Sequence, residues 1–177
     1  FNTFLFKLLY IYIIYLMKKV IIQKERKTRK IINELDNSSN LLNENTSNEI
    51  ILINKLYINE KFENSVLYVH EIKKKINGYR NQDIKKDKLN IIISYEETLE
   101  KLVESQLKCY YCKEKVCIIY KKIREPKQWT LDRLNNNIGH NKENTVICCL
   151  DCNLKRRVKN HEDFKFTKQL IIKKSNY

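Results

Sequence analysis

Several residue types and patterns are scarce or missing in this 177-residue chain. It contains no alanine, only two glycines and one proline, while lysine, asparagine and isoleucine are abundant. AT-rich codons would produce such a bias, so composition alone accounts for part of the lysine count. No segment recurs with a fixed period, which excludes a solenoid. The length and the 42% hydrophobic content suffice for one modest core, so we expect a single compact unit with appendages.

The sequence also has no convincing signal for a membrane span or a secretory leader. The most apolar stretch, FLFKLLYIYIIYLM, is shorter than the roughly 20 residues of a spanning helix, contains Lys7 and lacks a small-residue cleavage site. We interpret residues 1–16 as non-native upstream sequence, with a membrane-proximal anchor or a buried helix as alternatives. The six cysteines then favour an intracellular, reducing setting, where clustered cysteines bind metal more often than they form disulfides.

Positive charge is present in excess. The 35 Lys and Arg residues outnumber the 21 Asp and Glu residues, which gives a formal net charge of +14. Such a field attracts polyanions and speeds their encounter with the protein. Nucleic acid is therefore the leading partner, and nothing in the sequence indicates a small-molecule substrate or a membrane.

Composition divides the chain into four parts. Residues 33–48 are rich in Asn and Ser and have little to bury, which is typical of a linker. Residues 49–58 form an apolar run with β-branched side chains, which predicts a strand. Tyr, Lys and Arg mix along 66–88, a pattern that suits nucleic-acid contact or an ordinary surface. The parts are a leader (1–16), a basic arm with its Asn-rich linker (17–60), a helical lead-in (61–107) and a zinc-binding domain (108–170).

The clearest local signal is a helix that begins after Ser94. Ser94 and Glu97 match the S-x-x-E capping box. Four apolar residues then share one helical face: Leu99, Leu102, Val103 and Leu107. This helix leads directly into the first cysteine pair.

Four cysteines have the spacing of a zinc site. Cys109 and Cys112, like Cys149 and Cys152, are separated by two residues, which lets a tight turn aim two thiolates at one tetrahedral ion. Zinc would pin together the ends of the polar segment 113–148, which is too polar to build a core of its own. We expect all four thiolates to hold one structural Zn²⁺, and Cys117 and Cys148 to be small buried residues outside the site.

The segment between and after the pairs predicts a strand (127–133), a loop (134–144), a strand (145–149) and a helix (150–160). With Cys109, Cys112, Asp132, Asn144 and the run CLDCN ending at Asn153, this order resembles the HNH, or ββα-metal (His-Me) finger, endonucleases. The segment resembles their zinc-containing form, similar to recombination endonuclease VII, and it also resembles HNH proteins of large DNA viruses. The resemblance covers roughly residues 92–170.

The resemblance implies an α+β protein: a small zinc-stapled ββα-metal finger preceded by a mainly helical, partly disordered basic N-terminal region. It implies that Asp132 and Asn153 hold a catalytic Mg²⁺ or Mn²⁺ through hard oxygen ligands. Asn144 would brace the loop through backbone hydrogen bonds. The implied activity is metal-dependent hydrolysis of phosphodiester bonds in duplex or branched DNA.

The sequence departs from the family pattern at one position. Where the family has a histidine that deprotonates water, this chain has Arg133, which cannot accept a proton near neutrality. His140 in the loop could act as the base instead. Alternatively, Arg133 clamps the phosphate while hydroxide attacks. In the third interpretation catalysis is lost, and the protein is an inactive zinc-finger DNA-binding protein; a zinc module for protein contacts is a further rival.

Basic residues flank the finger on both sides. They can grip backbone phosphates without reading bases. The candidate DNA contacts are Lys121, Lys122 and Arg124 before the first strand and Lys155, Arg156, Arg157 and Lys159 after Asn153.

Overall fold

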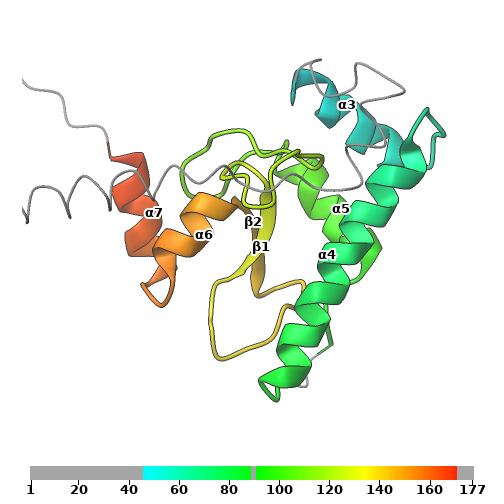
Figure 1. The fold of residues 1–177 in the computed structure, drawn as a ribbon. Coiled ribbons are helices and arrows are strands. Elements are labelled where there is room, and N and C mark those ends of the chain that lie inside the picture. Colours follow the sequence, from blue (N-terminus) through cyan, green and yellow to red (C-terminus); the bar gives the residue numbers. More distant parts are fainter. Residues whose placement is uncertain (1–45, 89–90, 171–177) are drawn as a thin grey trace, which may run out of the picture.

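The computed structural model describes residues 46–88 and 91–170. The expected leader, the basic arm and most of the Asn-rich linker lie outside the described residues. The described part is α+β, as expected, and joins a β-hairpin to helices on both sides (Figure 1). Its elements are α3 (Thr46–Tyr57), α4 (Ser65–Lys85), α5 (Tyr95–Glu104), β1 (Trp129–Arg133), β2 (Thr145–Cys149), α6 (Leu150–Arg156) and α7 (His161–Gln169).

The hairpin lies at the centre of the described structure. β1 pairs antiparallel with β2, and Asp132 lies opposite Val146. In Figure 1 the hairpin runs between α4 and α5 on one side and α6 and α7 on the other. Alternation along β1 sends Trp129 and Leu131 into the core shared with α5, and sends Thr130 and Asp132 toward α6. Both predicted strands are confirmed, with the second at its predicted bounds.

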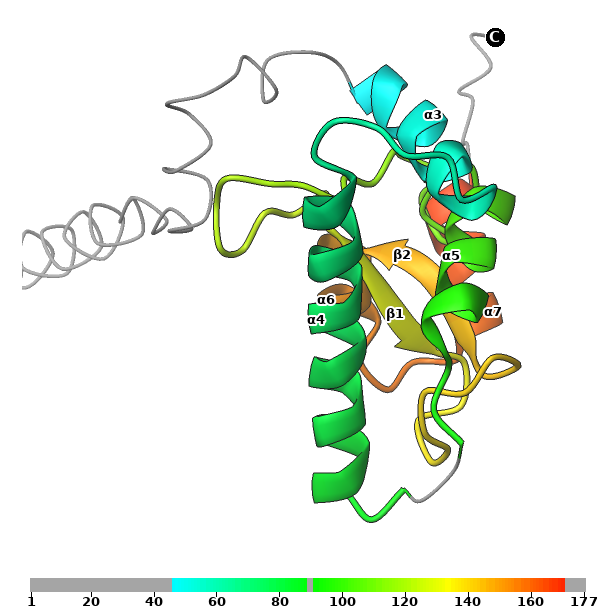
Figure 2. The same cartoon turned by 90° about the vertical axis from the view of Figure 1, so that its right-hand side faces the viewer.

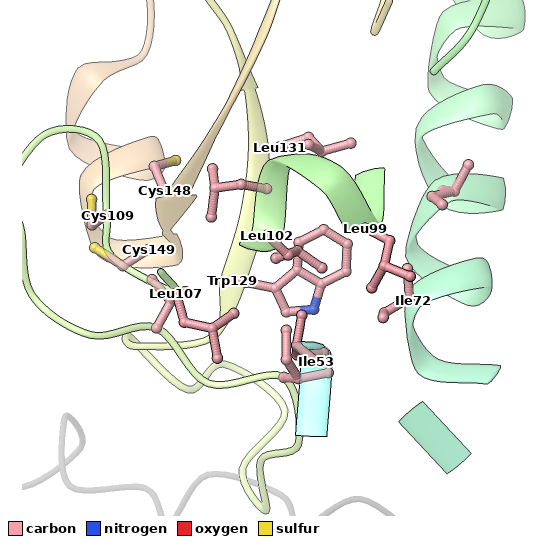
Figure 3. Packing of buried hydrophobic residues seen from close by; sticks show 14 of the residues in the cluster. Ile53, Ile72, Leu99, Leu102, Leu107, Cys109, Trp129, Leu131, Cys148 and Cys149 are labelled. Carbon is pink, nitrogen blue, oxygen red and sulfur yellow. The ribbon is translucent and has the colours of Figure 1, made fainter. Parts of the chain in front are cut away.

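Trp129 is the centre of the hydrophobic core. Its fully buried ring lies among aliphatic side chains from three helices, Ile53 of α3, Ile72 of α4 and Leu102 of α5 (Figure 3). The same cluster continues through Leu107 to the buried cysteines. The core therefore joins the helical lead-in to the finger, so the two regions pack as one unit.

The strand predicted at 49–58 is wrong, because these residues form most of α3. Ile53 and Leu56 are both buried, and α3 packs against α5. Residues three apart face one side of a helix but opposite sides of a strand, so only the helix buries both. The carboxylate of Glu49 accepts backbone hydrogen bonds from Ile118 and Ile119, each 3.0 Å long. Tertiary packing has thus overridden the β-branched composition.

Helix α4 lies along the free edge of β1 (Figure 2). The Tyr79 hydroxyl accepts a 3.0 Å hydrogen bond from the Leu131 amide, and Lys75 donates to the Trp129 carbonyl. Unpaired strand edges invite pairing with other chains, and these side chains satisfy this edge. Helix α4 confirms the helical character expected for the lead-in. It also shows that this region covers the free edge of β1.

The capping box before α5 is confirmed in both directions. The Ser94 hydroxyl accepts from the Glu97 amide, and the Glu97 carboxylate accepts from the Ser94 amide. Leu99 and Leu102 are buried, as their spacing predicts. The helix ends at Glu104, and Leu107 reaches the core from a left-handed backbone conformation with φ of 51°.

Helix α6 is shorter than expected. It ends at Arg156, because Arg157 adopts a positive φ of 52°, and a second helix, α7, starts after the Asn160 cap. The basic residues Arg157 and Lys159 therefore lie on a turn rather than on the helix. Among the described helices, none has the length and apolar content needed to cross a bilayer.

Candidate metal centre and basic cavity

Four cysteines come together, as their spacing predicts. The sulfurs of Cys109, Cys112, Cys149 and Cys152 all lie within 4.8 Å of one another. The first pair occupies a turn held to β2 by a 2.8 Å hydrogen bond from the Tyr110 amide to the Ile147 carbonyl. The second pair spans the end of β2 and the first turn of α6, where the Cys149 sulfur accepts from the Cys152 amide. This cluster has the donor set and the closeness of a structural metal site.

Without a cation, the thiols of this cluster cannot all ionise. A hydrogen bond from the Cys149 thiol lowers the pKa of Cys109 to about 5, and the same contact raises the pKa of Cys149. One thiolate is therefore stabilised by a neighbour that stays protonated. A bound divalent ion would remove this competition by neutralising several thiolates at once. Cys117 and Cys148 lie outside the cluster, and Cys148 is fully buried beside Thr130.

Asp132 forms a buried ion pair. Arg156 donates from Nε to Oδ2 (2.6 Å) and from Nη2 to Oδ1 (2.9 Å), and the Tyr111 hydroxyl donates to Oδ2 (2.6 Å). Asp132 is 5% exposed and Arg156 1%. Burial alone would lower the pKa of Arg156, but the hydrogen bonds and charge of Asp132 outweigh it and raise that pKa. Arg156 is therefore wrong as a surface contact for DNA, because its guanidinium is engaged inside the protein.

Asn153 is fixed on the same side of β1 as Asp132. Its amide Nδ2 donates to the Thr130 hydroxyl (3.1 Å) and to the Leu131 carbonyl (3.3 Å). The Thr130 hydroxyl donates its own hydrogen to the Cys148 carbonyl. Both partners of Asn153 Nδ2 are therefore acceptors, which fixes the orientation of the amide. The carboxamide oxygen of Asn153 keeps its acceptor capacity.

A basic cavity of about 620 Å³ lies along the outer edge of β1, between α4 and α6. Asp132, Asn153 and His140 all border it. Burial lowers the pKa of Lys88, the positive charges of Arg133 and Lys86 lower it further, and the charge of Asp83 opposes them. The cationic lining residues are Lys75, Lys86, Lys88, Arg133 and Arg157.

His140 and Arg133 meet at a carboxylate from α4. His140 Nδ1 lies 2.9 Å from Asp83 Oδ1, and its backbone amide donates to Asp83 Oδ2 at 2.6 Å. Arg133 Nη1 lies 3.6 Å from the same Oδ1 and has no hydrogen-bond partner although it is buried. Both His140 and Asp83 are almost fully buried. Two residues that are separated by the loop in sequence thus share one carboxylate at the cavity wall.

The imidazole of His140 is held in its neutral form at neutral pH. Burial lowers its pKa, the hydrogen bond and charge of Asp83 raise it, and the charge of Arg133 lowers it again, with a net decrease below the usual 6.5. The Tyr79 ring packs against the imidazole, with centroids 4.6 Å apart. A neutral, oriented imidazole beside a cavity can accept a proton.

Asn144 spans the loop that carries His140. Its Oδ1 accepts from the Asn135 amide (2.8 Å), and its Nδ2 donates to the carbonyls of Asn135 (2.9 Å) and Gly139 (3.0 Å). These bonds tie the start of the loop to its end. The loop therefore presents His140 from a fixed position.

The other basic residues singled out in the sequence are spread over the surface. Arg157 borders the cavity, whereas Lys155 pairs with Asp151 at 2.7 Å and Lys159 is exposed beyond α6. Lys121, Lys122 and Arg124 are exposed before β1 and do not border the cavity.

Sequence reasoning missed Asp83 and the role of α4. The single available signal is that Asp83 is the only acid in the basic stretch 72–86.

No family model, curated protein or solved structure matches this chain.

Proposed function

We propose that this protein is an HNH-type endonuclease that binds the DNA backbone in the basic cavity and hydrolyses a phosphodiester bond there. The observation that carries the proposal is the pairing of His140 and Arg133 at the cavity wall. One is an imidazole whose pKa is lowered, and the other is a partly exposed cation whose Nη1 makes no hydrogen bond. His140 would accept the proton that the family's histidine accepts. Arg133 would stabilise the negative charge on the phosphate.

Arg133 is suited to hold a phosphate. A buried donor without a partner is costly, and such groups are rare unless a ligand or water satisfies them. The Arg133 side chain is 12% exposed. It borders a cavity that four other cationic side chains also line. A phosphodiester oxygen in the cavity would accept a charge-assisted hydrogen bond from the exposed part of this guanidinium. Arg133 therefore takes the clamping role rather than that of a base.

His140 is suited to deprotonate the attacking water. Its remaining ring nitrogen, Nε2, would accept the proton as the water oxygen attacks phosphorus and the bond to the 3′ oxygen breaks. Arg133, Lys88 and Arg157 would stabilise the charge that develops on the phosphate oxygens. Solvent protonates the leaving oxygen.

The four-cysteine cluster fits structural Zn²⁺. Four sulfur ligands within 4.8 Å match a closed tetrahedral site with no open position, so this ion would hold the fold and take no part in catalysis. It would fix the end of β2 to the first turn of α6, which carries Asn153.

A catalytic Mg²⁺ or Mn²⁺ fits with a small donor set. Asp132 Oδ2 already accepts two hydrogen bonds, whereas Oδ1 accepts one and keeps one lone pair. The oxygens of Asp132 and Asn153 would hold the ion together with water and substrate phosphate, an arrangement common for Mg²⁺. When bound, it would supply Lewis-acid stabilisation of the phosphate.

A second candidate function is DNA binding without cleavage. The bidentate bond to Arg156 favours it, because that guanidinium already neutralises the carboxylate that a catalytic ion would use. The cationic cavity would still take a phosphate backbone.

Nicking of supercoiled plasmid by the full chain with Mg²⁺ or Mn²⁺ separates the two functions. We expect His140→Gln to abolish nicking and retain DNA binding, and Arg133→Met to weaken both. Lys61→Met, an exposed charge outside the cavity, controls for net charge. Binding that weakens with salt but never leads to nicking would favour the second function. Unchanged nicking in His140→Gln would reject the base, and absence of binding would reject both functions.

A further inference from the structure

We infer that Asp83, on helix α4 outside the ββα frame, is a positioning residue that holds the proton of neutral His140 on Nδ1 and leaves Nε2 as the acceptor facing the cavity. The catalytic consequence rests on the proposed function, whereas the protonation pattern does not. Helix α4 would then be part of the site rather than a support beside it.

The hydrogen bonds of Asp83 determine the tautomer. The carboxylate accepts at both oxygens, from the His140 amide at Oδ2 (2.6 Å) and from Nδ1 at Oδ1 (2.9 Å). An ionised carboxylate only accepts, so Nδ1 must donate. In a neutral ring the other nitrogen then carries the lone pair.

Nε2 is the ring nitrogen that the hydrogen bond to Asp83 leaves unused. None of the described residues forms a hydrogen bond with Nε2. Nε2 is also not one of the fully buried atoms of the described structure that lack a partner. It therefore keeps contact with solvent, although His140 as a whole is only 3% exposed. The solvent space that His140 borders is the basic cavity.

The surroundings leave the pair little freedom. Tyr79 of α4 packs on the imidazole, and Arg133 of β1 lies 3.6 Å from Asp83 Oδ1. The charge of Asp132 also acts on the ring from β1. A side chain at Gly139 would place its Cβ 2.9 Å from Asp83 Oδ2 and 3.2 Å from the Lys88 carbonyl. Because Gly139 has no positive φ, close approach to Asp83 is the reason for glycine at this position.

The substitution Asp83→Asn tests the inference sharply. The carboxamide of the new asparagine has one oxygen, which can accept from the His140 backbone amide or from Nδ1, but not from both. Its NH₂ group then faces whichever of these two groups the oxygen does not bond. The backbone N–H cannot change, whereas the ring can move its proton. Nδ1 should therefore become an acceptor and the proton should move to Nε2. Asp87→Asn removes the same charge at an exposed residue four positions on, where a φ of 54° suits asparagine.

The measurement is the nitrogen chemical shifts of the imidazole rings by NMR at a pH where His140 is neutral. The chain has three histidines, so His140→Gln assigns the signal. Wild type and Asp87→Asn should carry the proton on Nδ1, and Asp83→Asn on Nε2. A wild-type proton on Nε2, or an unchanged tautomer in folded Asp83→Asn, would overturn the inference.

Plasmid nicking then tests the catalytic consequence. Loss of the acceptor should slow nicking about 100-fold or more in Asp83→Asn and leave Asp87→Asn unchanged. If the tautomer changes in Asp83→Asn but the wild type does not nick DNA, the proposed function is rejected and the positioning role of Asp83 is kept. Equal nicking rates in wild type and Asp83→Asn would reject the catalytic consequence. If Asp83→Asn does not fold, Gly139→Ala replaces it, with Gly78→Ala as control, because nothing lies within 4 Å of a Cβ at Gly78. Gly139→Ala should displace Asp83 and disturb the His140 signal, and an unchanged signal would contradict the inference.

Discussion

The two sides of strand β1 differ in how their charges are matched. On the side of α6, the Asp132 carboxylate is paired with Arg156 and Tyr111, close to the cysteine cluster. On the side of α4, the next residue, Arg133, has a buried donor, Nη1, that lies 3.6 Å from Asp83 and makes no hydrogen bond, and it borders a cationic cavity. Groups whose hydrogen-bonding capacity is largely used hold a fold, whereas a group with spare capacity at a cavity can take a ligand. Stability should therefore depend more on the first side, where Asp132 Oδ1 keeps one lone pair, and phosphate binding more on the second.

The largest expected effect is the loss of metal from the structural side. Chelation or Cys109→Ser should unfold the finger, because zinc sites of this kind contribute on the order of 10 kcal/mol to folding. Circular dichroism and metal analysis check this, with about one zinc expected per chain. Cys117→Ser, outside the cluster, should keep both metal and fold. A finger that stays folded after chelation would remove the basis of the architecture.

Breaking the buried ion pair should have the next largest effect. Arg156→Met leaves Asp132 buried without its partner, which costs roughly 3–5 kcal/mol of unfolding free energy. Arg133→Met should change stability less, because its 3.6 Å contact with Asp83 is not a hydrogen bond and Asp83 keeps both bonds from His140, yet it should weaken DNA binding. Urea unfolding of both variants measures the contrast. Equal losses of stability would show that the two sides are not different in kind.

A smaller effect is expected from the Tyr111 hydroxyl. Tyr111→Phe removes one donor from Asp132 Oδ2, and a hydrogen bond to a charged group contributes about 1.5–3 kcal/mol. Tyr110→Phe alters the neighbouring half-buried ring, whose hydroxyl bonds to none of the described residues, and should stay within about 0.5 kcal/mol. Thermal unfolding compares the two variants, and a similar loss in both would contradict the saturated role of Asp132.

The smallest expected effect is the pH dependence that His140 adds on the open side. Its pKa in the folded protein is lowered, so as pH falls through about 6.5 the unfolded chain takes up a proton before the folded protein does. Stability should therefore decrease below that pH in wild type more than in His140→Gln, and the two should run parallel above it. Urea unfolding across pH 5–8 measures the difference. A His140→Gln slope identical to wild type would show that the imidazole pKa is not lowered.

Local sequence signals were sufficient for much of the finger. Capping at Ser94, the alternation of β1 and the two-residue spacing of the cysteines depend on near neighbours, so each could be found without coordinates. Helix α3 was not predictable from its β-branched residues, because burial of Ile53 and Leu56 against α5 decided its conformation. Arg156 was misplaced for a similar reason, since the sequence gives no sign that Asp132 would bury it.

The sequence by itself determined the cysteine pairs, the hairpin and the candidate base, because these depend on residue type and short spacing. Only the tertiary structure decided what those residues face. Asp83 is far from His140 along the chain, yet it meets the imidazole because α4 packs along the edge of β1. Pairing between distant charged groups depends on how the elements pack, and packing is decided by the whole core rather than by any local pattern.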